Sequence, residues 1–513
     1  MSSAATAEPA EPRDWPSARL LLAAFLAVHV AIWTLVPTLL HAGLPLDLVE
    51  GYAIGHEWVI GYFKHPALPW WLTEALRRAT GLVDAGAYGL SAASVALTYW
   101  LAWRIGRDMM SEARAAAGAL LLSGVMYFSW VVPEFNHNVA QMPLWLAFIL
   151  CLWRTRQTDL VMWWIALGFI SAFGLYAKLA HAVLLVAAIV YALADVKLRS
   201  KLLTSGPWIA LTVFAVASLP LAWWLVASDF LPFDYVATRT RSSRGSTVAV
   251  FLLKQAGSLA GLIVLLAVAR TGVNWPSAPG NDGHSRDAAV DPDARRFLGW
   301  LFVVPLTLVA ALAAVTGTGL RGSWGTPMLS LAGPLAMAMV PLASERAALN
   351  RIALGAFVLL IVVPAAYTVV TLQPSGRHLT PKRTSWPQAE IAREMQAIWR
   401  RETGLPLRVV AGDLWVAGMI AAHAPDRPSV LVEGSLRLSP WIDRQRLARE
   451  GFMAVWWRAA SDPPDYLRSW IGTRIDGRQT FKMRNGDHHE TAVVYYTIVK
   501  PGALDPAAGP PDR

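Results

Sequence analysis

A series of apolar segments, each about as long as a bilayer is thick, constrains this chain more than any other feature. A transmembrane helix needs roughly 20 mostly apolar residues, and eleven runs approach that length, two of them falling short. The runs lie near 19–41, 86–105, 115–133, 139–153, 161–178, 181–196, 206–227, 247–269, 297–317, 325–343 and 352–372. A hydrophobic content of 55% against 16% charged residues agrees with this. The sequence therefore predicts an all-α polytopic membrane protein of about 11 transmembrane helices.

The distribution of basic residues predicts how these helices are oriented. With a cytoplasmic N-terminus, the cytoplasmic connections hold sixteen Lys and Arg residues and the opposite connections hold eight, as the positive-inside rule requires. An odd number of spans then places the C-terminus on the extracytoplasmic side. The formal charge of +10 follows from this distribution and gives no reason to expect a nucleic acid partner.

Polar stretches flank and interrupt the apolar runs. Residues 1–18 lack the basic and short apolar regions of a signal peptide, so we expect a disordered cytoplasmic tail and a retained first helix. Residues 271–296 are rich in Pro, Gly, Asp and Ser, which predicts a flexible cytoplasmic linker. The single cysteine, Cys151, excludes both an intrachain disulfide and a cysteine metal site.

The composition becomes that of a soluble protein from about residue 373 onward. Alternating helical and strand patterns predict a small extracytoplasmic α/β domain over 373–500. The sequence "RNGD" at 484–487, between two strand-like segments, is typical of a hairpin turn. The overlapping "GDHHE" is not expected to hold a metal, because neighbouring histidines on a strand point to opposite faces. Residues 501–513 predict a disordered tail.

The segment "LDLVEGYAIGHEWVIGYFKHPALPWWL", residues 46–72, is too charged to cross a bilayer and too apolar for a plain loop. As a helix it places Asp47, Glu50 and Glu57 on one face, so that it would lie at the membrane interface with an acidic stripe toward a cavity or water. The same residues also suit a purely structural interpretation. In that interpretation Asp47 caps the helix, Glu50 completes a capping box and Glu57 is solvated.

The second half of this segment predicts a turn at headgroup depth. Pro66 and Pro69 impose an extended or turn geometry, and the aromatic neighbours suit an interfacial belt. Lys64 and His65 would then either bind a lipid phosphate or simply reach toward anionic headgroups.

An acidic residue just after the first apolar run, followed by "GYFKHPALPWWL", resembles the first extracytoplasmic loop of the family 39 glycosyltransferases of the GT-C fold. These are relatives of the protein O-mannosyltransferases and of the aminoarabinose transferases that modify lipid A. The order and spacing match, and the helix layout extends the resemblance over most of the chain. There are two departures: Leu48 follows Asp47 where the family usually has Glu, and Ala67 replaces a Pro.

The resemblance implies a GT-C catalytic domain over residues 19–372, with its first loop at 42–85, in a bacterial inner membrane. It implies transfer of a sugar from a polyprenyl-phosphate donor to an envelope acceptor: lipid A or another glycolipid, a polysaccharide, or a protein. Asp47 would be the base or would orient the acceptor, and Glu50, one helical turn on, would supply a second carboxylate. No cofactor is implied with certainty, and a divalent cation is left open.

A second polar group lies in "VVPEFNHNVAQMPLW", residues 131–145, at the expected outer membrane surface. Amide and imidazole groups offer sugar hydroxyls both donors and acceptors. The candidate substrate ligands are Glu57, Glu134, Asn136, His137 and Asn138. The resemblance puts a second acidic motif here, but Asn stands where Asp is common. Capping of two helix ends is the alternative.

Cations on the expected outer side run against the positive-inside bias and need an anionic partner, for which a lipid phosphate is the simplest candidate. The candidate lipid-phosphate ligands are Lys64, His65, Lys178, Arg239, Arg241, Arg244 and Arg321. The alternatives are snorkelling for Lys178 at a helix end and a solvated loop for any single arginine.

Two rival functions come from other classes. A transporter or flippase of lipid-linked sugars often carries internal repeats with broken helices, whereas here the polar residues gather at one membrane surface. A catalytically degenerate binding protein, in which the C-terminal domain does the work, is kept open by the missing Glu after Asp47.

Overall fold

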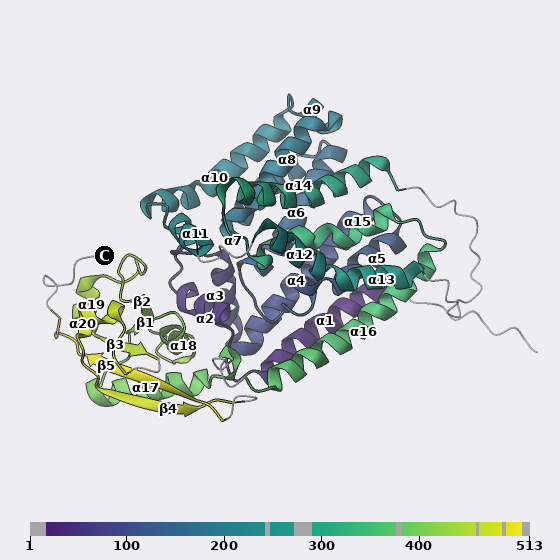
Figure 1. Ribbon diagram of the computed structural model, residues 1–513. Coiled ribbons are helices and arrows are strands. Elements are labelled where there is room, and N and C mark those ends of the chain that lie inside the picture. Colours follow the sequence, from purple (N-terminus) through teal and green to yellow (C-terminus); the bar gives the residue numbers. More distant parts are fainter. Residues whose placement is uncertain are drawn as a thin grey trace, which may run out of the picture.

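The structure is a computed structural model that describes residues 17–241, 247–270, 290–375, 382–457, 461–484 and 489–504. Its helices form an elongated bundle, and a small sheet with its own helices stands at one end (Figure 1). Two short helices, α2 (Leu46–Gly55) and α3 (Leu68–Thr80), lie between these two parts. The described chain is thus mostly helical with a small C-terminal sheet, in agreement with the sequence.

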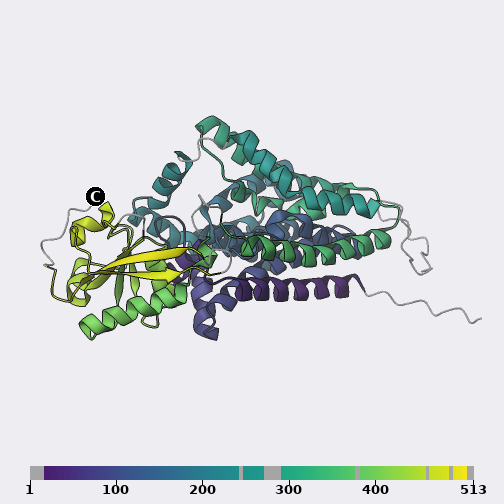
Figure 2. The same ribbon diagram turned by 60° about the horizontal axis from the view of Figure 1, so that its bottom comes forward.

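The long helices of the bundle run roughly parallel to its length (Figure 2). They are α1 (Ala18–Leu40), α4 (Asp84–Arg107), α5 (Glu112–Leu121), α6 (His137–Gln157), α7 (Val161–Ala177), α8 (Ala182–Ala194), α10 (Ser205–Ala227), α12 (Val248–Ser258), α13 (Ala260–Arg270), α14 (Pro292–Thr316), α15 (Ala332–Met339) and α16 (Glu345–Leu372). Two shorter helices, α9 (Val196–Lys201) and α11 (Leu231–Arg241), sit at opposite ends of α10. The first and last helices of the bundle, α1 and α16, lie side by side.

Four described helices, α1, α10, α14 and α16, are long and apolar enough to cross a membrane, and the pair α12–α13, bent by 41°, would make a fifth. The expected count of eleven is therefore not confirmed. The run expected at 115–133 does not form one helix: α5 ends at Leu121, and Gly124, three residues on, approaches Gly261 so closely that a Cβ would overlap the backbone there. Shorter apolar helices occupy 161–177, 179–194 and 328–339. Apolar composition alone does not show where such helices break.

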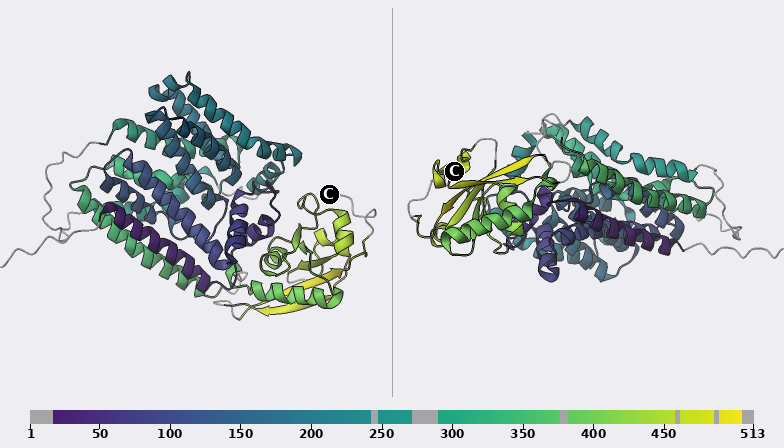
Figure 3. Two further views of the ribbon diagram at one scale, coloured as in Figure 1. Left: turned by 180° about the vertical axis from the view of Figure 1, so that it is seen from behind. Right: turned by 90° about the horizontal axis from the view of Figure 1, so that it is seen from below.

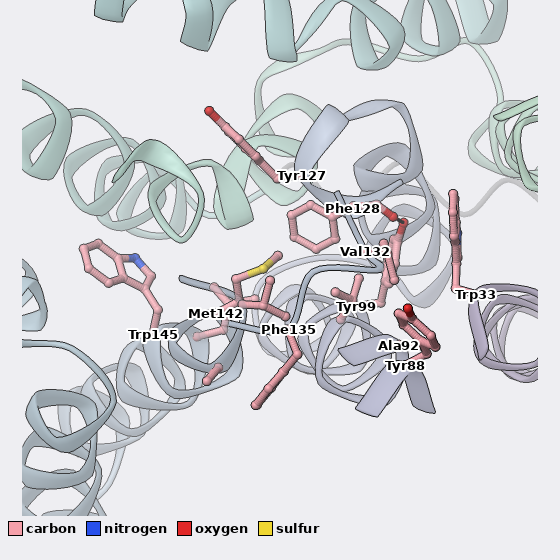
Figure 4. Packing of buried hydrophobic residues seen from close by; sticks show 14 of the residues in the cluster. Trp33, Tyr88, Ala92, Tyr99, Tyr127, Phe128, Val132, Phe135, Met142 and Trp145 are labelled. Carbon is pink, nitrogen blue, oxygen red and sulfur yellow. Dashed lines mark hydrogen bonds between the residues drawn. The ribbon is translucent and has the colours of Figure 1, made fainter. Parts of the chain in front are cut away.

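A buried aromatic core fixes the irregular chain that leads into α6. Tyr99 of α4 packs edge-on against Phe128, with 5.1 Å between ring centroids, and donates to the Phe128 carbonyl at 3.3 Å. Ser91, also on α4, donates to the carbonyl of Val132 at 2.5 Å. Figure 4 shows Tyr99, Phe128, Val132 and Phe135 close together in this core. The segment between α5 and α6 is therefore held against α4.

The C-terminal sheet has five strands in the order β2-β1-β3-β5-β4. The strands are β1 (Val409–Gly412), β2 (Ser429–Val432), β3 (Phe452–Trp456), β4 (Gly477–Lys482) and β5 (Thr491–Val499), and the helices are α17 (Gln388–Thr403), α18 (Val416–His423), α19 (Arg444–Glu450) and α20 (Asp465–Ile471). β1 pairs in parallel with β2 and β3, whereas β5 pairs antiparallel with β3 and β4. The β4–β5 pairing confirms the predicted hairpin, although its turn, residues 485–488, lies outside the described residues.

The sheet domain packs onto the first loop. Gly418 of α18 faces α2 so closely that an added Cβ would lie 2.9 Å from the side chain of Val49. Arg427, just before β2, donates to Glu74 of α3 at 2.8 Å. Figure 3 shows the purple segment that contains α2 and α3 against the sheet domain from two further sides. The loop between α1 and α4 is thus an interface between the two parts of the chain.

A buried ion cluster joins three helices at the end of α6 remote from this loop. The Arg156 side chain, which is 2% exposed, donates through Nε to both carboxylate oxygens of Asp195, at 3.2 and 3.1 Å. It also donates to Asp293 of α14 at 2.7 Å. Lys197 reaches the same Asp293 at 3.2 Å but is 58% exposed. The buried arginine is therefore the member on which the cluster depends.

Replacing Arg156 by alanine is expected to lower the free energy of unfolding by about 3 kcal/mol, because Asp195 would stay buried without its partner. Lys197→Ala is the matched control, since an exposed ion pair contributes at most about 1 kcal/mol. Thermal unfolding of both variants in the same detergent measures the difference. Equal and small shifts of the two midpoints would contradict the stabilising role of the Arg156 cluster.

Candidate active site

Asp47 lies in the first turn of α2 and bonds across to α6. Its Oδ2 accepts a hydrogen bond of 3.0 Å from Nδ2 of Asn136. Asn136 is the residue that precedes α6, and its Oδ1 accepts from the backbone N–H groups of Asn138 and Val139 at 2.9 and 3.3 Å. A single amide thus caps α6 and holds the Asp47 carboxylate.

The capping-box interpretation of α2 is wrong. The residue before the helix is Pro45, and no side chain caps the first N–H groups. Glu50 is buried, and its carboxylate turns the other way: Oε1 accepts a hydrogen bond of 2.5 Å from the Tyr62 hydroxyl, and Oε2 pairs with Nζ of Lys64. Both acidic side chains at the start of α2 are therefore used in contacts with other elements.

The prediction that Asp47, Glu50 and Glu57 share one face of a helix, toward a cavity or water, is also wrong, because the three carboxylates contact different partners. The helix ends at Gly55, and all residues from Leu48 to Gly55 are buried. Glu57 lies beyond the helix end, where its carboxylate is 3.0 Å from Nε2 of His56. The helix ends before Glu57 and is covered by α3 and α18. It therefore has no solvent-facing side that could carry all three carboxylates.

Lys64 and His65 lie on a tight turn at Pro66. The Tyr62 N–H donates to the carbonyl of His65 at 3.0 Å. His137, the first residue of α6, donates through Nε2 to the Pro66 carbonyl at 3.1 Å, because a carbonyl can only accept. The His137 ring centroid lies 4.4 Å from that of His65. The turn is therefore fixed to the same helix end that holds Asp47.

A break between α7 and α8 brings Lys178 to the same place. Lys178 follows the last residue of α7 and donates through Nζ to Oδ1 of Asn138. It is 8% exposed, so it does not reach out to headgroups. The structure thus brings together eight of the predicted site residues: Asp47, Glu50, Lys64, His65, Asn136, His137, Asn138 and Lys178.

Burial and charge set the protonation of this cluster. Burial, and then the negative charge of Glu50, raise the pKa of Asp47 above its ordinary value. Burial would lower the pKa of Lys64, but the adjacent Glu50 carboxylate outweighs it and holds that pKa above the usual value. Burial, followed by neighbouring positive charge, lowers the pKa of His65 well below its ordinary range. The cluster therefore combines a carboxyl group with a raised pKa, an ammonium group that Glu50 favours in its charged form, and an imidazole that burial favours in its neutral form.

Three described candidate ligands lie outside the cluster: Glu57, beyond the end of α2, Glu134 and Arg321. Glu134 is exposed at its edge, where the charge of Asp47 acts on it. Arg321 is an exposed residue that precedes a short 3₁₀ turn (Gly322–Gly325), and its carbonyl accepts from the Trp324 N–H. The described contacts of Arg321 do not join it to the cluster.

The three loop arginines are not described. The side chains of Arg239 and Arg241, at the end of α11, and the whole of Arg244 lie outside the described residues. A neighbouring residue of α11 does contact the cluster, because the Tyr235 ring centroid is 5.9 Å from that of His65 and 5.9 Å from Nζ of Lys64.

Sequence reasoning missed Tyr235 and Arg383 and assigned no role to Tyr62. Tyr62 had a signal, because it stands in the "GYF" of the loop motif. Arg383 is exposed in the segment between α16 and α17, and its positive charge acts on both Asp47 and Glu134. Nothing local in the sequence joins residue 383 to residue 47, so only the tertiary structure could find it.

Within the described ranges, no three His, Cys, Asp or Glu side chains are arranged to hold a metal. His65 and His137 are neighbours, but Nε2 of His137 already donates to the Pro66 carbonyl. No step of the chemistry below is therefore assigned to a metal.

Comparison with known proteins shows the class. A family model described as dolichyl-phosphate-mannose-protein mannosyltransferase matches residues 64–224. The lipopolysaccharide core galacturonosyltransferase RgtA of Rhizobium johnstonii is 25% identical over 453 residues, which are 86% of this chain and 87% of that protein. Crystal structures of ArnT from Cupriavidus metallidurans, bound to undecaprenyl phosphate and in the apo state, superpose with TM-scores of 0.60 and 0.59. They are 15% and 14% identical, and each comparison covers 93% of this chain and 97% of the other.

These matches and the fold define the protein as a membrane glycosyltransferase of the GT-C type. Within that class it is similar to the glycosyltransferases of the family 39 type, which its loop motif also resembles.

Asn136→Ala is expected to lower the free energy of unfolding by about 1 kcal/mol, because α6 loses its N-cap. Asn136→Ser is the matched variant: a serine hydroxyl can still cap the helix and brings no second negative charge beside Asp47, so its effect on stability should be smaller. Thermal unfolding in detergent compares the two. The same loss in both variants would mean that the cap is not what Asn136 contributes to stability.

Proposed function

We propose that this protein transfers a sugar from a polyprenyl-phosphate donor to a hydroxyl or phosphate of an envelope acceptor: a glycolipid such as lipid A, a polysaccharide or a protein. The reaction takes place on the extracytoplasmic side of a bacterial inner membrane. Residues 19–372 form the catalytic domain, and the 373–500 domain lies on the extracytoplasmic side. Similar proteins support the donor and acceptor classes, since ArnT is seen with undecaprenyl phosphate and RgtA acts on a lipopolysaccharide core.

One observation carries the proposal: the half-buried carboxyl group of Asp47, whose pKa is raised, shares a cluster with the side chains of Lys64 and Lys178. Asp47 takes the proton from the acceptor hydroxyl, and the acceptor oxygen attacks the anomeric carbon. The bond from that carbon to the donor phosphate breaks through an oxocarbenium-like state. The electron pair leaves with the polyprenyl phosphate, whose charge Lys64 and Lys178 stabilise.

Glu50 has a different role from that of a second base. Its two oxygens are already engaged by Tyr62 and Lys64, so it holds the lysine ammonium in place. It also raises the pKa of Asp47. Glu50 therefore supports both the cation and the base without touching the acceptor.

The Asp47→Asn variant is expected to reduce sugar transfer at least about 100-fold, because the amide cannot accept the hydroxyl proton. The measurement uses protein reconstituted in vesicles with labelled polyprenyl-phosphate sugar. The variant should unfold at the wild-type temperature. Near wild-type transfer would remove Asp47 from the mechanism.

The same vesicles separate the rival functions. Translocation of the donor without covalent transfer by the wild-type protein would favour a flippase, and neither reaction would favour a binding protein. Mass spectrometry of envelope lipids and proteins from cells with and without the protein then identifies the sugar as a missing mass increment.

The pH dependence of transfer tests the electrostatics. The rate should rise with pH as Asp47 loses its proton, with a midpoint above the ordinary aspartate pKa. Glu50→Gln should move this midpoint to lower pH, because a negative neighbour that raises the pKa of Asp47 is removed and the Lys64 charge is left uncompensated. Glu57→Gln, beyond the end of α2, is the control and should leave the midpoint unchanged. An unchanged or higher midpoint in Glu50→Gln would contradict this account.

A further inference from the structure

The segment between α16 and α17, together with the first residue of α17, is hydrogen-bonded to the chain just before α2. The carbonyl of Thr384 accepts hydrogen bonds from the N–H groups of Ala42 and Gly43, at 2.8 and 3.2 Å. Gln388, the first residue of α17, then bonds the backbone of Leu44 in both directions: Leu44 N–H donates to Oε1 at 3.0 Å, and Nε2 donates to the Leu44 carbonyl at 2.8 Å. We call residues 42–44 with 384–388 the clasp.

The orientation of the Gln388 amide follows from these bonds. A backbone N–H can only donate, so the atom that faces Leu44 N–H is the amide oxygen. Nε2 of His423, in α18, lies 3.1 Å from the same oxygen and must therefore be the donor. Gln388 is fully buried, and the described structure gives each of its polar atoms a partner. One side chain thus joins α17, α18 and the start of the first loop.

The clasp admits only glycine at position 43. An added Cβ would lie 2.5 Å from Cδ of Gln388 and 2.6 Å from the carbonyl oxygen of Trp386. Trp386 is itself 2% exposed, and its ring packs edge-on against Trp415 and Trp457 of the sheet domain, at 5.6 and 5.0 Å. The clasp therefore rests on the rigid core of that domain.

The clasp lies three residues from the proposed base. Leu44 is followed by Pro45, and α2 begins at Leu46, so little chain separates the Gln388 bonds from Asp47. Further along, α18 packs on the same helix through Gly418 and Val49. The C-terminal domain thus contacts α2 at its start and along its side, while the bundle holds Asp47 through Asn136 alone among its described hydrogen bonds.

We infer that Gln388 is a positioning residue for Asp47. Through it, the C-terminal domain helps to hold the proposed base in the position that sugar transfer requires. This inference rests on the proposed function. The donor cation Lys178 is anchored by Asn138 of α6, and Lys64 lies on the turn that His137 of α6 holds through the Pro66 carbonyl, so both cations have an anchor outside the clasp. Loss of the clasp should therefore misplace the base and leave donor binding intact.

The test compares Gln388→Ala with Gln396→Ala in the full-length protein reconstituted in vesicles. Gln396 is a matched control, because it is a buried glutamine of the same helix whose Oε1 accepts from the Asp426 N–H within the C-terminal domain. Gln388→Ala is expected to lower kcat at least tenfold with the KM for the polyprenyl-phosphate sugar within twofold of wild type. Gln396→Ala should keep both near wild type.

Two further variants change the residues that contact Gln388 and leave the glutamine itself in place. Gly43→Ala should give the Gln388→Ala phenotype while the glutamine is present, because the new methyl group pushes it away. His423→Phe removes only the imidazole donor to Gln388 and should lower kcat severalfold with KM unchanged. It serves as the decisive variant if Gln388→Ala does not accumulate in membranes.

The outcomes are distinguishable. Wild-type kcat in Gln388→Ala, or an equal loss in Gln396→Ala, would overturn the positioning role while wild-type transfer leaves the proposed function standing. A rise in KM with unchanged kcat would also overturn it, since that pattern belongs to donor binding. Absence of transfer in the wild-type protein would instead remove the proposed function itself.

Discussion

The amide of Asn136 carries the interaction on which the rest of the site depends. It caps α6 with its oxygen and holds the Asp47 carboxylate with its nitrogen. A buried carboxylate is costly unless it is hydrogen-bonded, so this one bond couples the placement of the acid to the start of a bundle helix. The core around Tyr99 and Phe128 fixes the chain that leads to Asn136. The packing of the bundle therefore reaches Asp47 through this side chain.

Charge compensation explains how several ionisable groups can share so buried a place. Glu50 compensates the charge of Lys64, whereas Lys178 has only a hydrogen bond to the Asn138 amide, and burial lowers the pKa of Lys178 to about 8. Burial and the negative charge of Glu50 raise the pKa of Asp47, which has no direct ion pair among its described contacts. A site built in this way keeps one carboxylate available for proton transfer and holds its cations ready for an anionic leaving group.

The first loop is also the meeting point of the two parts of the chain. α2 is covered by α3 and α18, and the clasp at Gln388 fixes its start. A helix that looked interfacial from its sequence is thus internal to the protein. Its apolar residues, from Leu48 to Gly55, are buried against protein, which accounts for the mixture of charge and apolar surface in this segment.

Much of the candidate site could be predicted from the sequence, because its residues come from short polar stretches that interrupt apolar runs. The loop motif, the "EFNHN" turn and Lys178 are recognisable in the sequence because they are polar groups between or within apolar runs, where such groups are rare. The number of full spans could not be predicted, since helix breaks such as that after Leu121 occur beside close backbone contacts between distant glycines. The capping role assigned to Asp47 failed for a similar reason, because its bond goes to a residue of another helix.

By itself the sequence determined that the chain is helical and membrane-embedded, that a small α/β part follows, and that acids and cations cluster in the first loop. Those properties depend on composition and short-range periodicity, which a single sequence displays. Only the tertiary structure decided which carboxylate is free of an ion pair and can accept a proton, and that Glu50 pairs with Lys64. It also brought Arg383 and Gln388 to the site from more than 300 residues away in the sequence. These are contacts between segments far apart in the chain, and no local pattern encodes where such segments meet.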